Sequence, residues 1–149
     1  MSLVAFPAPV PGLVIRYGYL WYGEHLQGRE EGQKDRPCAI VASIRADENG
    51  ETRVLVLPVT HSPPDPASLA IEIPAPVKRR LALDDERSWV VLSEWNEFTW
   101  PGPDLRPVAR GEKAPVAYGV LPPSLFDTIR DRFMAIVAAR GARRVQRTE

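Results

Sequence analysis

Proline is the feature of this sequence that most restricts its fold. The 149 residues include 16 prolines, which are spread over most of the chain. Each proline fixes φ and lacks a backbone donor, so it ends helices and occurs in turns and at sheet edges. The segments between prolines are therefore mostly short, and they favour strands joined by turns over long helices.

Several short apolar segments have the composition or the alternation that is typical of β-strands. They are rich in Val, Ile, Leu and aromatic residues, and turn sequences such as Asn49-Gly50 and Pro63-Pro64 separate them. The expected strands are Leu13–Tyr22, Cys38–Ile44, Arg53–Thr60, Leu69–Ile73, Trp89–Leu92 and Ala117–Leu121. Short strands at this spacing predict a mainly β fold, either a small barrel or a sandwich.

One long helix is expected near the C-terminus. The segment Pro122–Ser124 is a helix-starting signal, and Asp127 follows at the spacing of a capping box. Apolar residues then recur at helical spacing up to Val137, and Gly141 marks the end of the helix. We expect its apolar stripe to cover an open side of the sheet. A shorter helix is expected at Val77–Leu81.

Length indicates one domain, and the charge balance limits the kind of ligand that its surface binds. Lys and Arg total 19, Asp and Glu total 19, and the formal net charge is zero. This balance disfavours a protein whose whole surface binds polyphosphate, but it permits a basic patch. We expect an N-terminal extension over residues 1–11, a folded domain over 12–140 and a basic tail over 141–149. The tail is expected to be solvated, or else to attract phosphate.

The single cysteine and the absence of long apolar runs indicate the compartment. Cys38 alone cannot form an intrachain disulfide, which favours a reducing environment, and its apolar neighbours predict an inert core residue. One cysteine and two histidines are too few for a structural zinc site. No apolar run reaches the roughly 18 residues of a membrane span. We therefore expect a cytoplasmic protein without a membrane segment.

Polar residues stand at the ends of several expected strands. Arg36 precedes the second strand, Thr60–Ser62 ends the third, and Glu94 follows the fifth. Arginine binds phosphate through two donors, a hydroxyl donates to the same oxygens, and a carboxylate or imidazole accepts a proton from a ribose hydroxyl. The set predicts metal-independent cleavage of a phosphodiester. The alternative is that Arg36 pairs with a neighbouring carboxylate, such as Asp35 or Glu31.

Four segments also occur in the order found in one toxin family. They are Gln33–Val41, which contains Arg-Pro before an apolar strand, Val56–Ser62 with its Pro-x-Thr, Trp89–Glu94, and Gly119–Pro122. Through these segments the chain resembles the MazF/PemK family of growth-inhibiting toxins from type II toxin–antitoxin systems. The chain departs from the family at Ser93-Glu94-Trp95, where many members have an Asp-Gln pair.

The resemblance implies a fold, an activity and partners. The implied fold is an SH3-like small β-barrel with a C-terminal α-helix, usually a homodimer. The implied activity is metal-independent, sequence-selective cleavage of single-stranded RNA without a cofactor, which leaves a 2′,3′-cyclic phosphate and a 5′-hydroxyl. The implied protein partner is an antitoxin whose disordered segment folds over the toxin dimer.

The resemblance also implies roles for individual residues. Arg36 matches the family's catalytic arginine, Thr60 matches its threonine at the same phosphate, and Glu94 lies near the acidic residue that acts as base in some members. We further expect RNA-binding residues in the long polar segment 23–35 and beside the catalytic positions, namely His25, Lys34, His61, Ser62 and Trp95. The aromatic residues Trp95, Phe98 and Trp100 could stack bases, anchor the antitoxin or close the core.

A second interpretation keeps the barrel but not the catalysis. The zero net charge and the replaced family Asp favour a non-enzymatic SH3-like binding protein. Such a protein would poison a protein target, as the family's gyrase-directed relatives do, or would be a degenerate toxin.

Overall fold

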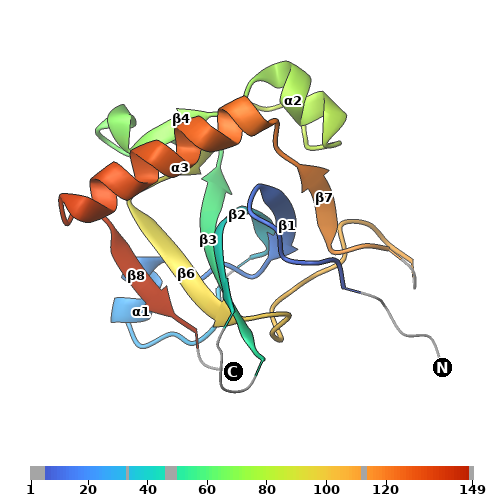
Figure 1. The fold of residues 1–149 in the computed structure, drawn as a ribbon, viewed down its shortest axis with the longest axis horizontal. Coiled ribbons are helices and arrows are strands. Elements are labelled where there is room, and N and C mark those ends of the chain that lie inside the picture. The colour runs from blue at the N-terminus through green and yellow to red at the C-terminus, as the bar shows by residue number, and fades with distance from the viewer. Residues whose placement is uncertain (1–5, 33, 46–49, 112–113, 148–149) are drawn as a thin grey trace.

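The structure is a computed structural model that describes residues 6–32, 34–45, 50–111 and 114–147 (Figure 1). Gln33 of the family-like segment and Asn49 of an expected turn lie outside these residues. The described elements, in chain order, are β1 (Leu13–Tyr17), α1 (Tyr22–Leu26), β2 (Arg36–Arg45), β3 (Thr52–Thr60), the 3-10 helix η1 (Ala67–Leu69), β4 (Ala70–Glu72), α2 (Ala75–Arg80), β5 (Trp89–Val91), β6 (Glu94–Thr99), β7 (Ala117–Val120), α3 (Pro123–Ala138) and β8 (Arg143–Gln146).

The eight strands form one sheet. Six of them follow the order β4-β5-β3-β2-β1-β7, while β6 pairs with β3, and β8 pairs with β6. One edge of β3 pairs with β6 over its first half and with β5 at Val59 and Thr60. All pairings are antiparallel except the parallel pair β6 and β8. Within the described residues no pairing joins β4 to β7, so the sheet stays open. The mainly β fold with a C-terminal helix is confirmed, whereas the expected barrel closure is not observed.

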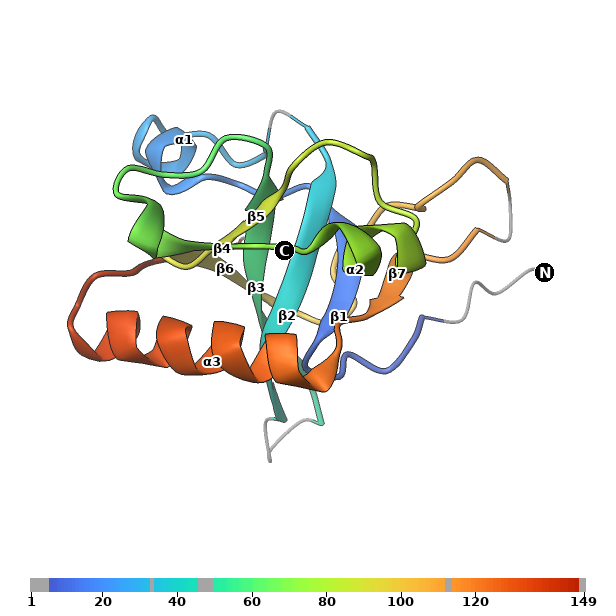
Figure 2. The same cartoon turned by 90° about the horizontal axis from the view of Figure 1, so that it is seen from above.

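Alternating residues of β2 divide the core into two halves. Ala39 and Val41 face one apolar cluster, which also contains Ile129 and Phe133 of α3. Cys38 and Ile40 face a second cluster, which contains Tyr17 of β1 and Phe98 of β6. Successive side chains of a strand point to opposite faces, so a sheet buried on both faces requires a continuous apolar run. The helix α3 crosses one of these faces (Figure 2), as its apolar stripe predicts.

The ends of α3 differ from the sequence expectation. The expected capping box is wrong, because the helix begins at Pro123 with Pro122 as its N-cap and no side-chain cap. Proline suits the first helical position because its missing N–H would have no helical partner there. At the other end Arg140, with φ of 60°, takes the left-handed position that precedes Gly141. The short helix α2 is confirmed. No described helix has the length and apolarity that crossing a membrane would need.

Besides the 3-10 helix η1, three elements differ from the sequence expectation. The first expected strand ends at Tyr17, and the chain then turns into the short helix α1. The segment after Ser93 forms β6, whose side chains alternate between buried and half-buried positions. The expectation of a solvated tail is wrong for residues 143–147, because β8 pairs with β6 and Arg147 is buried.

Candidate functional site

A cavity of about 500 Å³ opens where β2 begins and β3 ends. The two strands are antiparallel neighbours, and their register sets Cys38 opposite Pro58. Two residues further along, this register brings Arg36 and Thr60 to the same end of the sheet, and both line the cavity. Lys34, His61 and Ser62 line it as well. The expectation that polar groups at these strand ends share one site is thus met for these residues.

Arg36 is held in place without being neutralised. Its Nη1 donates to the backbone oxygen of Val59 over 3.3 Å, and its guanidinium carbon lies 4.9 Å from the centre of the Trp21 ring. Its Nε is buried and has no hydrogen-bond partner among the described residues. The alternative pairing with Asp35 or Glu31 is not found there, since Asp35 instead contacts Arg16 and Arg106. The guanidinium therefore retains donors for an anionic ligand.

Thr60 and Ser62 form a tight turn at the cavity wall. The Ser62 N–H donates to Thr60 Oγ1 over 3.2 Å, and Thr60 Oγ1 lies 3.3 Å from the Ser62 carbonyl oxygen. Both side chains remain accessible, because Thr60 is half-buried and Ser62 is exposed. The Thr60 hydroxyl can exchange its long intramolecular bond for a bond to a phosphate oxygen.

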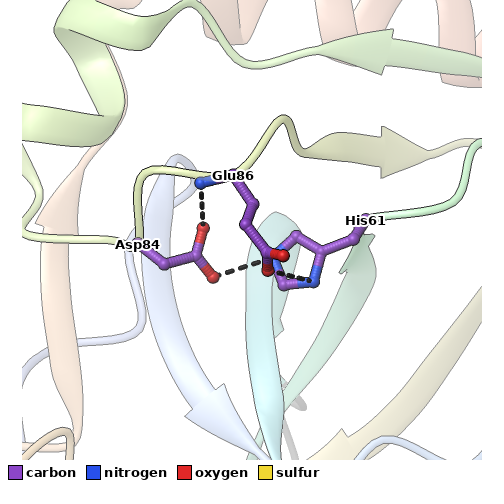
Figure 3. A group of neighbouring side chains, drawn as sticks. All are labelled: His61, Asp84 and Glu86. Carbon is purple, nitrogen blue, oxygen red and sulfur yellow. Dashed lines mark hydrogen bonds and ion pairs between the residues drawn. The ribbon is translucent and has the colours of Figure 1, made fainter.

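His61 is bonded to carboxylates on both of its ring nitrogens (Figure 3). Its Nε2 lies 2.7 Å from Asp84 Oδ2, and its Nδ1 lies 3.3 Å from Glu86 Oε2. The Glu86 side chain is 67% exposed, so a ligand can displace the longer of these contacts. The Asp84 carboxylate is anchored more firmly, because its Oδ1 accepts from Lys78 Nζ over 2.6 Å.

Lys78 makes the Asp84 position rigid. It is buried, and its ammonium group also donates to Ser88 Oγ over 2.6 Å and to the Glu86 carbonyl. Partial burial raises the pKa of Asp84, but hydrogen bonds from Lys78 and His61 outweigh this effect and leave the pKa below its usual range. Asp84 is therefore an ionised partner that fixes the ring of His61.

The oxygen and nitrogen atoms of His61, Asp84 and Glu86 lie within 4.8 Å of one another, a distance that a metal ion could bridge. The Lys78 ammonium already supplies a positive charge to Asp84, and the three side chains bond to one another. In this structure the three side chains and Lys78 form an ion-pair network.

Glu94 is not among the described residues that line the cavity. Glu94 Oε1 accepts hydrogen bonds from Tyr19 Oη over 3.1 Å and from the Tyr22 N–H over 2.9 Å. Burial raises the pKa of Glu94, with hydrogen bonds and the charge of Arg36 offsetting part of the effect. The residues bonded to Glu94 flank Trp21, which in turn covers Arg36. Glu94 thus interacts with Arg36 through charge and contacts residues that flank Trp21, but it does not line the cavity.

The remaining expected RNA-binding residues also lie elsewhere. Trp95 packs edge-on against Phe133, with 5.5 Å between the ring centres. Its ring therefore closes the core, which is one of the three roles expected for it. Phe98 is likewise buried, with its ring 4.7 Å from that of Tyr17, and Trp100 packs beside it. His25 is exposed on α1 and lines a separate hollow near Arg147.

Sequence reasoning missed several side chains of the site. The expected strand Leu13–Tyr22 includes Trp21, and the polar segment that follows is the one sequence signal for its place beside the site. No sequence motif marks Asp84 and Lys78 as site residues. They lie near His61 because β3 pairs with β5, which brings the segment before Trp89 to the end of β3. Cys38 is fully buried and burial raises its pKa, which confirms the inert core residue.

Comparisons with models of protein families, with curated proteins and with solved structures give no match to this chain. The cavity between Arg36, Thr60 and His61 is consequently the feature that indicates what the chain does.

Proposed function

We propose that the chain is a metal-independent endoribonuclease that cleaves single-stranded RNA, acting in the cytoplasm as the toxin of a type II toxin–antitoxin pair of the MazF/PemK kind. The observation that carries this proposal is the shared cavity of Arg36 and Thr60, in which the guanidinium has no carboxylate partner among the described residues. The helix-covered sheet is compatible with an SH3-like arrangement of the strands.

Arg36 and Thr60 bind the scissile phosphate in this proposal. The guanidinium donates to two non-bridging oxygens and stabilises the charge that develops on them. Cation–π contact with Trp21 at 4.9 Å orients the guanidinium without using its donors. The Thr60 hydroxyl adds a further hydrogen bond, and Lys34 adds positive charge at the exposed rim.

The nucleophile is the ribose 2′-hydroxyl next to the scissile phosphate. Its oxygen attacks phosphorus, the bond to the 5′-oxygen breaks, and the departing 5′-oxygen takes a proton from water, so that the products are a 2′,3′-cyclic phosphate and a 5′-hydroxyl. His61 is the imidazole in the cavity wall, and it accepts the 2′-hydroxyl proton once the substrate has displaced Glu86. Asp84 orients the ring and stabilises the imidazolium that forms. The base is therefore His61 and not Glu94, since Glu94 does not line the cavity.

The partners implied by this function are an antitoxin and a second copy of the chain. An antitoxin segment that folds over the cavity would exclude RNA from Arg36. Co-expression with a small neighbouring open reading frame, followed by measurement of growth and of complex formation, tests this part of the proposal.

The decisive experiment incubates the purified chain with unstructured RNA in EDTA and analyses the termini of the products. The wild type is expected to leave cyclic phosphate and 5′-hydroxyl ends, and Arg36→Ala is expected to abolish cutting while the fold persists. The matched control is Arg132→Ala, an exposed arginine of α3 that does not line the cavity, which should cut normally. Intact RNA with the wild type would favour the non-enzymatic binding protein, and cutting by Arg36→Ala would remove the site.

A further inference from the structure

A second hollow, of about 520 Å³, adjoins the Arg36 cavity. Arg16 and Asp35 line both spaces, so the two hollows share these side chains as a common border. Arg106 and Arg110 line the second hollow only, together with Pro107, Ala109 and Gly111. We call this hollow the arginine groove and define it by Arg16, Arg106, Arg110 and Asp35.

The charges of the arginine groove are not balanced. Asp35 is the one carboxylate among the described residues that line it, and it lies 4.0 Å from Arg16 Nη2 and 3.8 Å from Arg106 Nε. Arg106 Nη2 also lies 4.0 Å from Asp104 Oδ1. These separations are at the outer limit of an ion pair, and the side chains involved are partly exposed, so the contacts are weak. Arg110 is exposed and forms no ion pair within the described part of the chain. The groove therefore carries excess positive charge.

Backbone oxygens hold two of these guanidinium groups in position. Arg16 Nη1 donates to the Pro107 carbonyl over 3.2 Å, and Arg106 Nη1 donates to the Pro103 carbonyl over 2.8 Å. A carbonyl fixes a guanidinium without cancelling its charge, and it leaves the other donors free. Positioned cations with free donors are what phosphate recognition requires.

We propose that the arginine groove binds the phosphate backbone of the nucleotides that flank the cleaved bond in a single-stranded RNA. This inference rests on the proposed function, because the adjoining cavity supplies the cleavage site. Since the groove has arginine side chains and no aromatic lining residue among those described, it reads phosphate charge and not base identity. A strand seated at Arg36 continues past Arg16 into the groove.

The test measures binding of a 2′-O-methyl RNA of about eight nucleotides, which lies within the usual range of single-strand site sizes. This probe lacks the 2′-hydroxyl, so binding is measured without cleavage. We compare the wild type with Arg110→Gln and with the matched control Arg132→Gln, over a series of salt concentrations. Arg110 makes no ion pair in the described chain, so its substitution should leave the fold intact, which circular dichroism checks.

For Arg110→Gln we expect the Kd at low salt to rise about three- to tenfold and the slope of log K against log salt to fall by about 0.7, the loss of one phosphate contact. Arg132→Gln should keep the wild-type slope. Cleavage assays add a second measurement, in which Arg110→Gln raises the KM for the long RNA more than the KM for a dinucleotide. The proposed role of the groove alone would be overturned if the wild type cuts RNA but Arg110→Gln and Arg132→Gln have the same salt slope and the same ratio of KM for long RNA to KM for the dinucleotide. A wild type that neither binds nor cuts RNA would overturn the proposed function as well.

Discussion

Arg147 Nη2 lies 3.0 Å from Asp104 Oδ2, and this contact joins the C-terminal strand to the loop after β6. The Arg147 side chain is only 2% exposed. Its Nη1 also donates to the Tyr17 hydroxyl over 3.1 Å and to the Gly18 carbonyl over 2.7 Å. One guanidinium therefore connects β8, the end of β1 and the loop that carries Asp104.

Replacing Arg147 should destabilise the fold strongly. Arg147→Ala leaves the Asp104 carboxylate and the Gly18 carbonyl with unmet hydrogen bonds in a buried setting, and breaking a buried pair in this way costs about 3–5 kcal/mol. Urea unfolding measures the change. The matched control Arg144→Ala, on the exposed side of the same strand, should shift the free energy of unfolding by less than about 0.5 kcal/mol. Equal stability of the two variants would contradict the anchoring role.

The tail shows where sequence reasoning stops. From the sequence, Arg143 and Arg147 cannot be told apart, because both are basic residues near the C-terminus and neither lies in a periodic apolar pattern. Only the parallel pairing with β6 turns one residue outward and buries another. The apolar strands and α3 were predictable because each has its own burial periodicity, whereas β8 depends on partners about 50 residues earlier in the chain, as its register with Glu94–Glu97 shows.

The C-terminal end of α3 offers a stabilising substitution. Arg140 has φ of 60°, and its N–H donates to the Val137 carbonyl, while the Gly141 N–H donates to the Ile136 carbonyl. These paired bonds are a Schellman motif whose left-handed position is occupied by Arg140, one residue before the glycine expected there.

Arg140→Gly should therefore raise the free energy of unfolding by about 0.5–1 kcal/mol, because glycine takes a positive φ without strain. Ala139→Gly, at the neighbouring position with φ of −84°, should lower it. Thermal unfolding of both variants gives the comparison. A loss of stability in Arg140→Gly would show that the arginine side chain contributes more than the backbone strain costs.

Glu94 should make the stability of the wild type depend on pH. Its carboxyl has a raised pKa in the folded protein because of burial, so the folded state holds this proton more tightly than the unfolded chain does. The stabilisation that comes from this tighter proton binding is fully present at pH values below 4.5, the ordinary pKa of a glutamate carboxyl. It is lost as the pH rises through the higher pKa of Glu94 in the folded protein. Glu94→Gln keeps an acceptor for the Tyr22 N–H but cannot ionise.

Relative to Glu94→Gln, the wild type should thus become less stable as the pH is raised above 4.5. Denaturant unfolding over a pH series measures this difference. The same variant should retain RNA cleavage, since Glu94 does not line the cavity that holds Arg36 and Thr60. A fall in kcat of about 100-fold or more would instead return the role of general base to Glu94.

The candidate site was predictable to the extent that strand ends define it. Arg36 and Thr60 stand directly beside apolar strands, so neighbouring antiparallel strands had to bring them to one edge. Glu94 also follows a strand, but its carboxylate accepts hydrogen bonds from Tyr19 and Tyr22, and it does not line the cavity. Asp84 lies in a loop without periodicity, and its distance from His61 is set by tertiary structure alone.

The contacts of His61 give a prediction that separates catalysis from ion pairing. His61→Gln removes the proposed base and should lower kcat about 100-fold or more, with little change in KM. Asp84→Asn should have a smaller effect of the same kind, because the ring loses the carboxylate that orients it at 2.7 Å. Glu86→Gln is the matched control, since it weakens the contact that the substrate must displace and should not lower kcat. Single-turnover cleavage of one RNA by all three variants provides the measurement. If Glu86→Gln were as defective as His61→Gln, the cluster would serve the structure of the loop and not proton transfer.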